Sequence, residues 1–169
     1  MHKLIVFFMW LAGIGVCYGQ AIAVKYDRFK DETIIHAPSE DAAIELAQNT
    51  GAPTPMLAVR FVGKDPSADT PTAAMLFFIV TVRTPADELC DSVDLIVDAR
   101  RVPRLKFRRV GRNEPTEKPS WLLASQVSME LMAEIVTASK VEFQLCTQVG
   151  LIPSPSRHAM QRELTRPRK

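Results

Sequence analysis

The amino-acid sequence predicts a mainly β protein, β-sandwich-like or α+β, with two short helices near the C-terminus. Three observations support this fold class. Proline or glycine recurs at short intervals from Pro38 to Pro155, short apolar runs lie between these breakers, and several runs alternate apolar with polar residues. Short alternating runs separated by frequent turns are typical of sandwiches and barrels, in which each strand buries one face.

Seven segments have the length and the apolar or β-branched content of strands. They are Thr33–Ala37, Met56–Val62, Ala73–Val82, Val93–Asp98, Arg104–Val110, Trp121–Val127 and Val141–Leu145. Ala73–Val82 is nearly all apolar, which favours a central strand that is buried on both faces. Asp41–Gln48 fits a helical and an alternating pattern alike, and we expect a strand or edge segment there.

Two segments near the C-terminus predict helices. Met129–Thr137 follows Ser128, a residue suited to the N-cap position. Arg157–Thr165 follows Ser156, a second suitable cap, and Pro167 comes shortly after its end. The expected core consists of inward-facing apolar residues of these elements, namely Leu57, Val59, Phe61, Leu76, Phe78, Val80, Leu95, Val97, Leu105, Phe107, Leu131, Ile135, Val141, Phe143 and Leu145.

The composition is that of an ordinary globular protein. The chain has 169 residues and a net charge of +2 from 21 basic and 19 acidic residues. Its apolar content of 47% and charged content of 24% are typical of globular domains, and the length suits one such domain. These values exclude collagen-like repeats, a long coiled coil, a disordered chain and a histone-like basic protein.

Residues 1–19 have the features of a secretory signal. Lys3 precedes the uncharged, apolar segment Leu4–Val16, and small residues follow up to Gly19. We therefore expect cleavage after Gly19 and a single β-rich domain over residues 20–169, with a short basic C-terminal tail, in the periplasm or outside the cell. An uncleaved anchor is one alternative, although a spanning helix needs about 20 apolar residues. Acylation of Cys17 is another, although a valine precedes it.

Two cysteines, Cys90 and Cys146, lie outside the predicted signal. Exported proteins enter an oxidising compartment, so these two residues form a candidate disulfide. The alternative is a pair of free cysteines that lie too far apart to meet.

The sequence lacks the local signatures of common catalytic and metal-binding sites. It contains no Cys-x-x-Cys, His-x-x-x-His or Gly-x-Ser-x-Gly, and its one Gly-x-Gly falls within residues 1–19. His36 and His158 have the surroundings of ordinary surface or half-buried histidines. We therefore expect no cofactor, no metal and no catalytic residue. The alternative is a hydrolase with paired carboxylates such as Glu114 and Glu117.

Charge is segregated in the middle of the chain. Ala86–Asp98 carries five acids and no base, and the following run to Arg112 carries seven bases and no acid. One interpretation is an anion-binding strand face that meets an anionic envelope surface. Its candidate residues are Arg104, Arg108, Arg109 and Arg112. Nucleic acid is not an expected partner, because the protein is expected to be exported.

The second interpretation is a hairpin in which the acidic and basic runs pair with each other. In the register that matches the apolar faces, Asp98 lies opposite Arg104. In the same register, Asp94 lies opposite Arg108. Each such cross-strand pair of opposite charges contributes roughly 0.2–1 kcal/mol to stability.

An early segment places two aromatic residues, Tyr26 and Phe29, among several charges. We expect these aromatic side chains to pack the N-terminal segment onto the domain. The alternative is a segment that binds a partner.

Three features of the chain occur together: the early Tyr26-Asp27-x-Phe29 segment, the late helix that begins Ser128-Met129-Glu130-Leu131, and a strand that ends near Gly150 before a terminal helix. In this combination the chain resembles a loose group of small, β-rich, largely uncharacterised exported bacterial proteins. The resemblance implies export and a single β domain, and it brings no catalytic residues. We therefore expect an exported, non-enzymatic binding or structural module. Its expected partner is an anionic envelope surface or another envelope protein, and no transmembrane span is expected in the mature chain.

Overall fold

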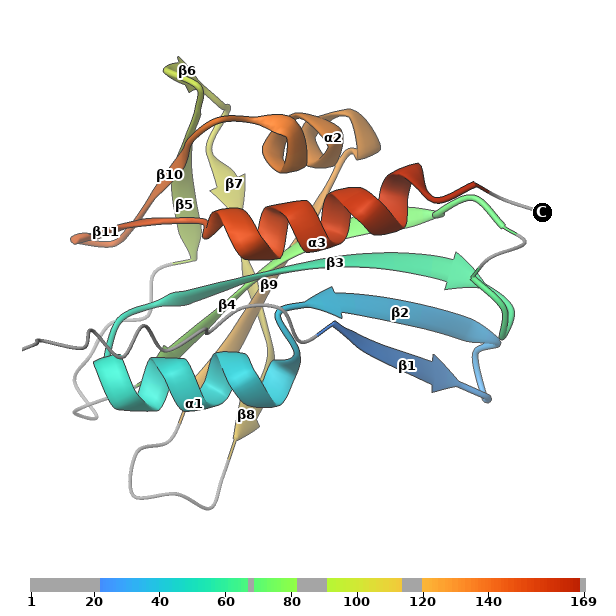
Figure 1. Cartoon of the computed structure of the whole chain (residues 1–169). Helices are drawn as coiled ribbons and strands as arrows, with labels where there is room; N and C mark the ends of the chain where they lie inside the picture. The colour runs from blue at the N-terminus through green and yellow to red at the C-terminus, as the bar shows by residue number, and fades with distance from the viewer. Residues whose placement is uncertain (1–21, 67–68, 82–90, 114–119, 168–169) are drawn as a thin grey trace, which may run out of the picture.

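The described residues form two antiparallel sheets and three helices (Figure 1). The computed structural model describes residues 22–66, 69–81, 91–113 and 120–167, so the predicted signal lies outside the described part. The larger sheet has six strands, in the order β1 (Ala23–Asp27), β2 (Glu32–Ala37), β3 (Thr54–Val62), β4 (Ala73–Thr81), β9 (Ser120–Val127) and β8 (Arg108–Asn113). The smaller sheet has the order β11 (Gln148–Leu151), β10 (Val141–Leu145), β5 (Ser92–Val97) and β6 (Arg100–Arg101), and β7 (Leu105–Lys106) also pairs with β5.

The helices lie on both faces of the larger sheet. The main core lies between the two sheets and is completed by α2 (Met129–Thr137) and α3 (Ser154–Thr165). On the opposite face of the larger sheet, α1 (Glu40–Thr50) packs over a smaller apolar cluster (Figure 1). The prediction of a mainly β protein is therefore confirmed. Among the helices that the structure describes, none is long and apolar enough to cross a membrane.

The core contains the residues that the strand pattern predicts. All of the predicted core residues are buried except Val80, Leu105 and Leu131, which are half-buried against the core. Strand β4 is buried on both faces, as predicted, because the main core lies on one side of it and α1 on the other. At the centre, the ring of Phe78 makes edge-to-face contacts with the rings of Phe107 and Phe143.

The prediction of a strand over Asp41–Gln48 is wrong, since this segment forms α1. Ser39 caps the helix by accepting a hydrogen bond from the backbone N–H of Ala42. Ala43 and Ala47, four residues apart, are fully buried against the sheet. Gly51 ends the helix in the left-handed conformation with a φ of 67°. A capping serine, a stripe of small residues and a C-terminal glycine together outweigh the local alternation.

The two predicted helices are present. The bounds of α2 are those predicted, and Ser128 caps it by accepting a hydrogen bond from the backbone N–H of Leu131. Helix α3 begins at Ser154, earlier than expected, with Pro153 at the N-cap position. Ser156 is therefore a buried residue within the first turn rather than the cap.

Candidate binding surfaces

The basic run does not form one strand, because the predicted strand Arg104–Val110 is interrupted at Phe107 and divided between β7 and β8. The chain turns at Asp98 and Ala99, whose φ angles of 44° and 70° are both positive, and Val97 pairs directly with Arg100. After β7 the chain crosses at the buried residue Phe107 from the smaller to the larger sheet and continues as β8. The tight turn brings β6 onto β5 immediately, and this fixes a register that the apolar pattern alone does not specify.

The predicted charge pairs are also changed by this register. Arg104 donates two hydrogen bonds to Asp94, from Nε to Oδ1 over 3.1 Å and from an Nη atom to Oδ2 over 2.8 Å. The predicted pair Asp94–Arg108 does not form, because Arg108 lies in the other sheet. The predicted pair Asp98–Arg104 does not form either, since Arg104 binds Asp94 instead. The hydrogen bonds from Arg104 lower the pKa of Asp94 below its ordinary value. This is a bidentate contact between a guanidinium and a carboxylate, so the guanidinium of Arg104 is already bound to Asp94 within the fold.

The arginines of β8 do not share one face. Arg108 pairs with Ala124, whose side chain belongs to the cluster under α1. Arg109 pairs with Leu123 on the main-core face, and its guanidinium lies 5.3 Å from the centre of the Trp121 ring. The side chain of Arg112 lies outside the described part of the chain. A common anion-binding face is therefore absent from the described side chains of this set, and an anion-binding role of the individual arginines stays a prediction.

Asp98 is held by backbone groups rather than by an arginine. Its two carboxylate oxygens accept hydrogen bonds from the N–H groups of Ser139 and Lys140, over 3.1 and 2.8 Å. These backbone hydrogen bonds lower the pKa of Asp98. The charged carboxylate thus connects the β5–β6 turn to the segment between α2 and β10.

We expect Asp98→Asn to reduce stability at neutral pH and to have a smaller effect in acid. A carboxyl group whose pKa is lower in the folded than in the unfolded state stabilises the fold above its unfolded-state pKa. That contribution is lost as the pH falls through the folded-state pKa, because the group then becomes protonated in both states. Urea unfolding of both proteins at pH 7 and pH 3 measures the effect. A difference between them that grows in acid would contradict this role of Asp98.

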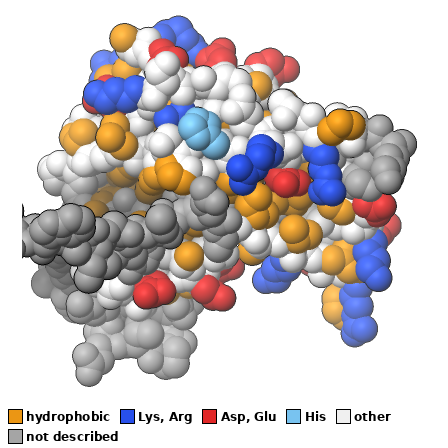
Figure 2. Space-filling view, viewed as in Figure 1, with side chains coloured by type: hydrophobic (Ala, Val, Ile, Leu, Met, Phe, Trp, Pro, Cys, Tyr) orange, Lys and Arg blue, Asp and Glu red, His pale blue; other side chains and the backbone are white. Residues whose placement is uncertain are grey.

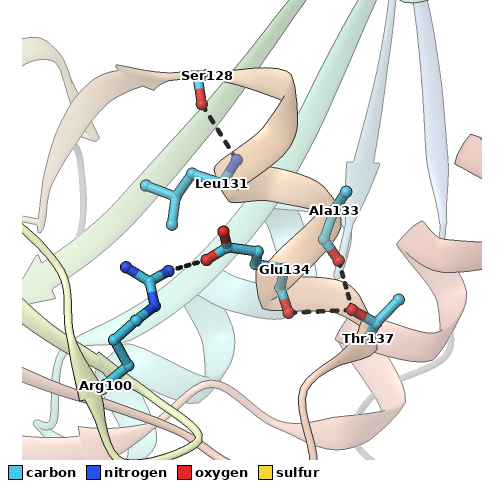
Figure 3. A network of polar contacts seen from close by, with 6 residues as sticks. All are labelled: Arg100, Ser128, Leu131, Ala133, Glu134 and Thr137. Carbon is cyan, nitrogen blue, oxygen red and sulfur yellow. Dashed lines mark hydrogen bonds and ion pairs between the residues drawn. The ribbon is translucent and has the colours of Figure 1, made fainter.

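A second ion pair connects the β5–β6 hairpin to α2 (Figure 3). Arg100 reaches from β6 to the carboxylate of Glu134, and both side chains are about half exposed. The pair crosses a shallow groove of about 370 Å³ between the hairpin, the end of β9 and the start of α2. Exposed ion pairs of this kind usually contribute at most about 1 kcal/mol, so this contact orients the hairpin more than it stabilises the fold.

The sequence gives no sign of the importance of Arg157. Its side chain is 3% exposed, and its guanidinium donates hydrogen bonds to the backbone carbonyls of Ile152, Ala138 and Ser139. Burial lowers its pKa, and the charge of Asp98 opposes that effect. The three carbonyls belong to the segment after α2 and the residues before α3, so Arg157 joins the two helices. A lone arginine in a predicted helix usually indicates a solvent-exposed position.

The hairpin of β1 and β2 carries the most exposed aromatic residue among those described. Phe29 lies in the turn with its side chain 87% exposed, and the guanidinium of Arg28 lies 4.9 Å from the centre of its ring. The expectation that Phe29 packs onto the domain is therefore wrong. Tyr26 is 39% exposed and Val24 is 61% exposed on the preceding strand. Figure 2 shows apolar and basic side chains next to each other at the end of this hairpin.

Local hydrogen bonds hold this turn in place. The hydroxyl of Tyr26 donates to Asp31 over 2.8 Å, and this hydrogen bond raises the pKa of Tyr26. The N–H of Phe29 donates to the carboxylate of Asp27, and the N–H of Gly63 donates to the carbonyl of Asp31. The aromatic tip is therefore presented by an ordered turn that is also anchored to the next hairpin. The expected packing failed because the chain reverses at Arg28–Asp31, beyond the edge of the core.

Three predicted site residues, Cys90, Glu114 and Glu117, lie outside the described residues. Cys146, the predicted partner of Cys90, is disulfide-bonded in the turn between β10 and β11.

His36 is half-buried, as expected from the sequence. The centre of its ring lies 6.0 Å from that of the stacked Phe77 ring, and burial lowers the pKa of His36.

Comparison with known proteins finds no matching family model, no matching curated protein and no matching solved structure.

Proposed function

We propose that this protein is an exported, non-enzymatic binding module that recognises another protein of the cell envelope through its β1–β2 hairpin. The observation that carries this proposal is the presentation of Phe29, 87% exposed and in contact with Arg28, at the tip of an ordered turn. Phenylalanine, tyrosine and arginine are enriched in the centres of protein interfaces, where they contribute much of the binding energy.

The edge of β1 supports the same proposal. Within the described part of the chain, β1 pairs only with β2, so its other side presents free backbone N–H and C=O groups. Val24 and Tyr26 lie on one face of this strand, and Lys25 and Asp27 lie on the other. A partner segment that adds to this edge would carry apolar residues at alternate positions, with an acid near Lys25 and a base near Asp27.

The charge of the hairpin favours a protein over an anionic lipid surface. Residues 25–32 contain three bases and three acids, so the segment has no net charge. Lys30 also forms an ion pair with Asp27 over 3.9 Å. Attraction to anionic lipids depends on clusters of unbalanced basic residues, at about 1 kcal/mol for each one near the surface. A balanced set of charges instead provides specific pairing with a protein of complementary pattern.

The test uses two variants of the hairpin. Val24→Lys places a charge on the open edge, and Phe29→Ala removes the exposed ring. Both positions are exposed, so the folding stability should change by no more than about 0.5 kcal/mol. Val149→Lys is the matched control, because it lies on β11, an edge strand of the smaller sheet, with a side chain 72% exposed.

We expect immobilised wild-type protein and the Val149→Lys control to retain the same envelope protein from an extract, and both hairpin variants to lose it. Equal retention by all four proteins would place the binding surface elsewhere and contradict the proposal. Retention of nothing by the wild type would contradict it as well. If the retained chain is a second copy of this protein, the hairpin is a dimer contact and the proposed partner is wrong.

A further inference from the structure

A pocket of about 340 Å³ lies on the α1 side of the larger sheet, between the start of α1 and the ends of β8 and β9. Its floor is aliphatic, formed by Ile44, Ile79 and Leu122. Glu40 and Asp41, in the first turn of α1, supply two carboxylates at its rim. Figure 2 shows acidic side chains over this helix. No lysine or arginine lies among the described residues that form the pocket.

Ser120 is a polar group in this pocket that the fold leaves without a partner. Its side chain lies on the α1 face of β9, since Ser120, Leu122 and Ala124 alternate with the main-core residue Leu123. The residue is 2% exposed, and its hydroxyl has no hydrogen-bond partner in the described part of the chain. Directly opposite in the register, the buried hydroxyl of Thr81 also lacks one.

Buried hydroxyls without a hydrogen-bond partner are rare in folded proteins. A hydroxyl that becomes buried loses its hydrogen bonds to water, and this costs free energy unless a new partner replaces the water. Acids in the first turn stabilise the positive end of α1, and this accounts for Glu40 and Asp41 without any ligand. It does not account for Ser120, whose hydroxyl has no hydrogen-bond partner among the described residues. The hydroxyl is the second and independent feature that indicates a bound molecule.

We propose that this pocket binds an alkylammonium group. Two carboxylates at the rim of a pocket whose described lining includes no lysine or arginine attract a cation, and Asp41 and Glu40 can accept charge-assisted hydrogen bonds from an ammonium. The hydroxyl of Ser120 supplies a further acceptor, and the aliphatic floor suits a methylene stem. A small diamine and the side chain of a lysine in a peptide share this chemistry. The proposal does not depend on the role of the hairpin.

The binding test titrates isotope-labelled, full-length protein with 1,5-diaminopentane and follows backbone amide shifts by NMR. We expect saturable shifts centred on Ile79, Gly111 and Leu122, and none from the neutral analogue 1,5-pentanediol. A parallel titration with N-acetyl-lysine amide decides whether a lysine side chain or a free diamine fits better. Equal binding of the diol would overturn the assignment to a cation. The absence of shifts with both amines would overturn the site.

Two substitutions test the groups that the proposal uses. Asp41→Asn should weaken diamine binding about tenfold, the size of one lost charge-assisted hydrogen bond, whereas Glu45→Gln on the same helix should not. Ser120→Ala should weaken binding and leave the melting temperature of the free protein unchanged or higher, because it removes an unpartnered hydroxyl. Ser125→Ala, on the same strand but outside the pocket, is the control. A lower melting temperature for Ser120→Ala together with unchanged binding would assign this hydroxyl to the fold and overturn its role.

Discussion

Replacing Phe78 by alanine is expected to lower the free energy of unfolding by about 3–5 kcal/mol. Its side chain is fully buried between the two sheets, and its ring centre lies 5.5 Å from that of Phe107 and 4.7 Å from that of Phe143. The substitution removes this contact area and leaves a cavity that close-packed neighbours fill only in part. Phe143→Ala should lower the free energy of unfolding by a similar amount, because Phe143 is buried and its ring is the partner of Phe78 in this contact.

Urea unfolding of the purified protein measures this loss, and Phe29→Ala is its matched control. The same substitution at a position 87% exposed should change stability by no more than about 0.5 kcal/mol. The double variant Phe78→Ala/Phe143→Ala should lose less than the sum of the two single losses, since the two rings contact each other. A cost for Phe78→Ala no greater than that for Phe29→Ala would contradict the proposed packing of the two sheets.

Arg157→Leu is expected to cost about 3 kcal/mol or more, although it replaces a buried cation by an apolar residue. The guanidinium satisfies the carbonyls of Ile152, Ala138 and Ser139, and leucine leaves all three without a donor. Each unsatisfied buried polar group costs about 1–3 kcal/mol. Arg157→Lys should fall between the wild type and Arg157→Leu, because an ammonium cannot reproduce the fork of donors.

Arg162→Leu on the same helix is the control, because its side chain is exposed. Thermal and urea unfolding of the three variants should place Arg162→Leu close to the wild type. If Arg157→Leu proves as stable as Arg162→Leu, the connection between α2 and α3 does not depend on the guanidinium.

Much of the fold could be predicted because the strands bury alternate residues. Val141–Leu145 alternates cleanly, and its bounds in the structure are those predicted. Helix α1 is not predicted from the sequence, although Ser39 and Gly51 bracket it, because the alternation of Ile44 and Leu46 around Glu45 also fits a strand. Capping residues determine where a helix starts and stops, and here they carried more information than short-range periodicity.

The register of the charged hairpin could not be derived from pattern matching. Several registers align apolar residues on one face, and the two-residue turn at Asp98 and Ala99 selects one of them. In that turn Asp98 does not contact Arg104. Its carboxylate instead accepts hydrogen bonds from the backbone N–H groups of Ser139 and Lys140, just before β10. The crossing at Phe107 depends on packing between the sheets, and no local signal marks it.

The candidate sites depend on contacts between distant segments, which explains why the sequence indicated them poorly. Ser120 is unremarkable in the sequence, and the packing of α1 against the larger sheet places it in a pocket. The exposure of Phe29 follows from the place where β1 turns into β2, whereas its residue type alone favoured burial. The pocket that contains Ser120 and the exposed tip that contains Phe29 both depend on how distant segments of the chain are arranged in the fold.

Hydrogen exchange of the full-length protein, with and without the partner that it retains, tests the proposed binding surface most directly. We expect binding to slow exchange at the amides of residues 23–31 and to leave exchange on β11, an edge strand of the smaller sheet, unchanged. Unchanged exchange at residues 23–31, with protection on β11 or at the groove beside α2, would contradict recognition through the β1–β2 hairpin.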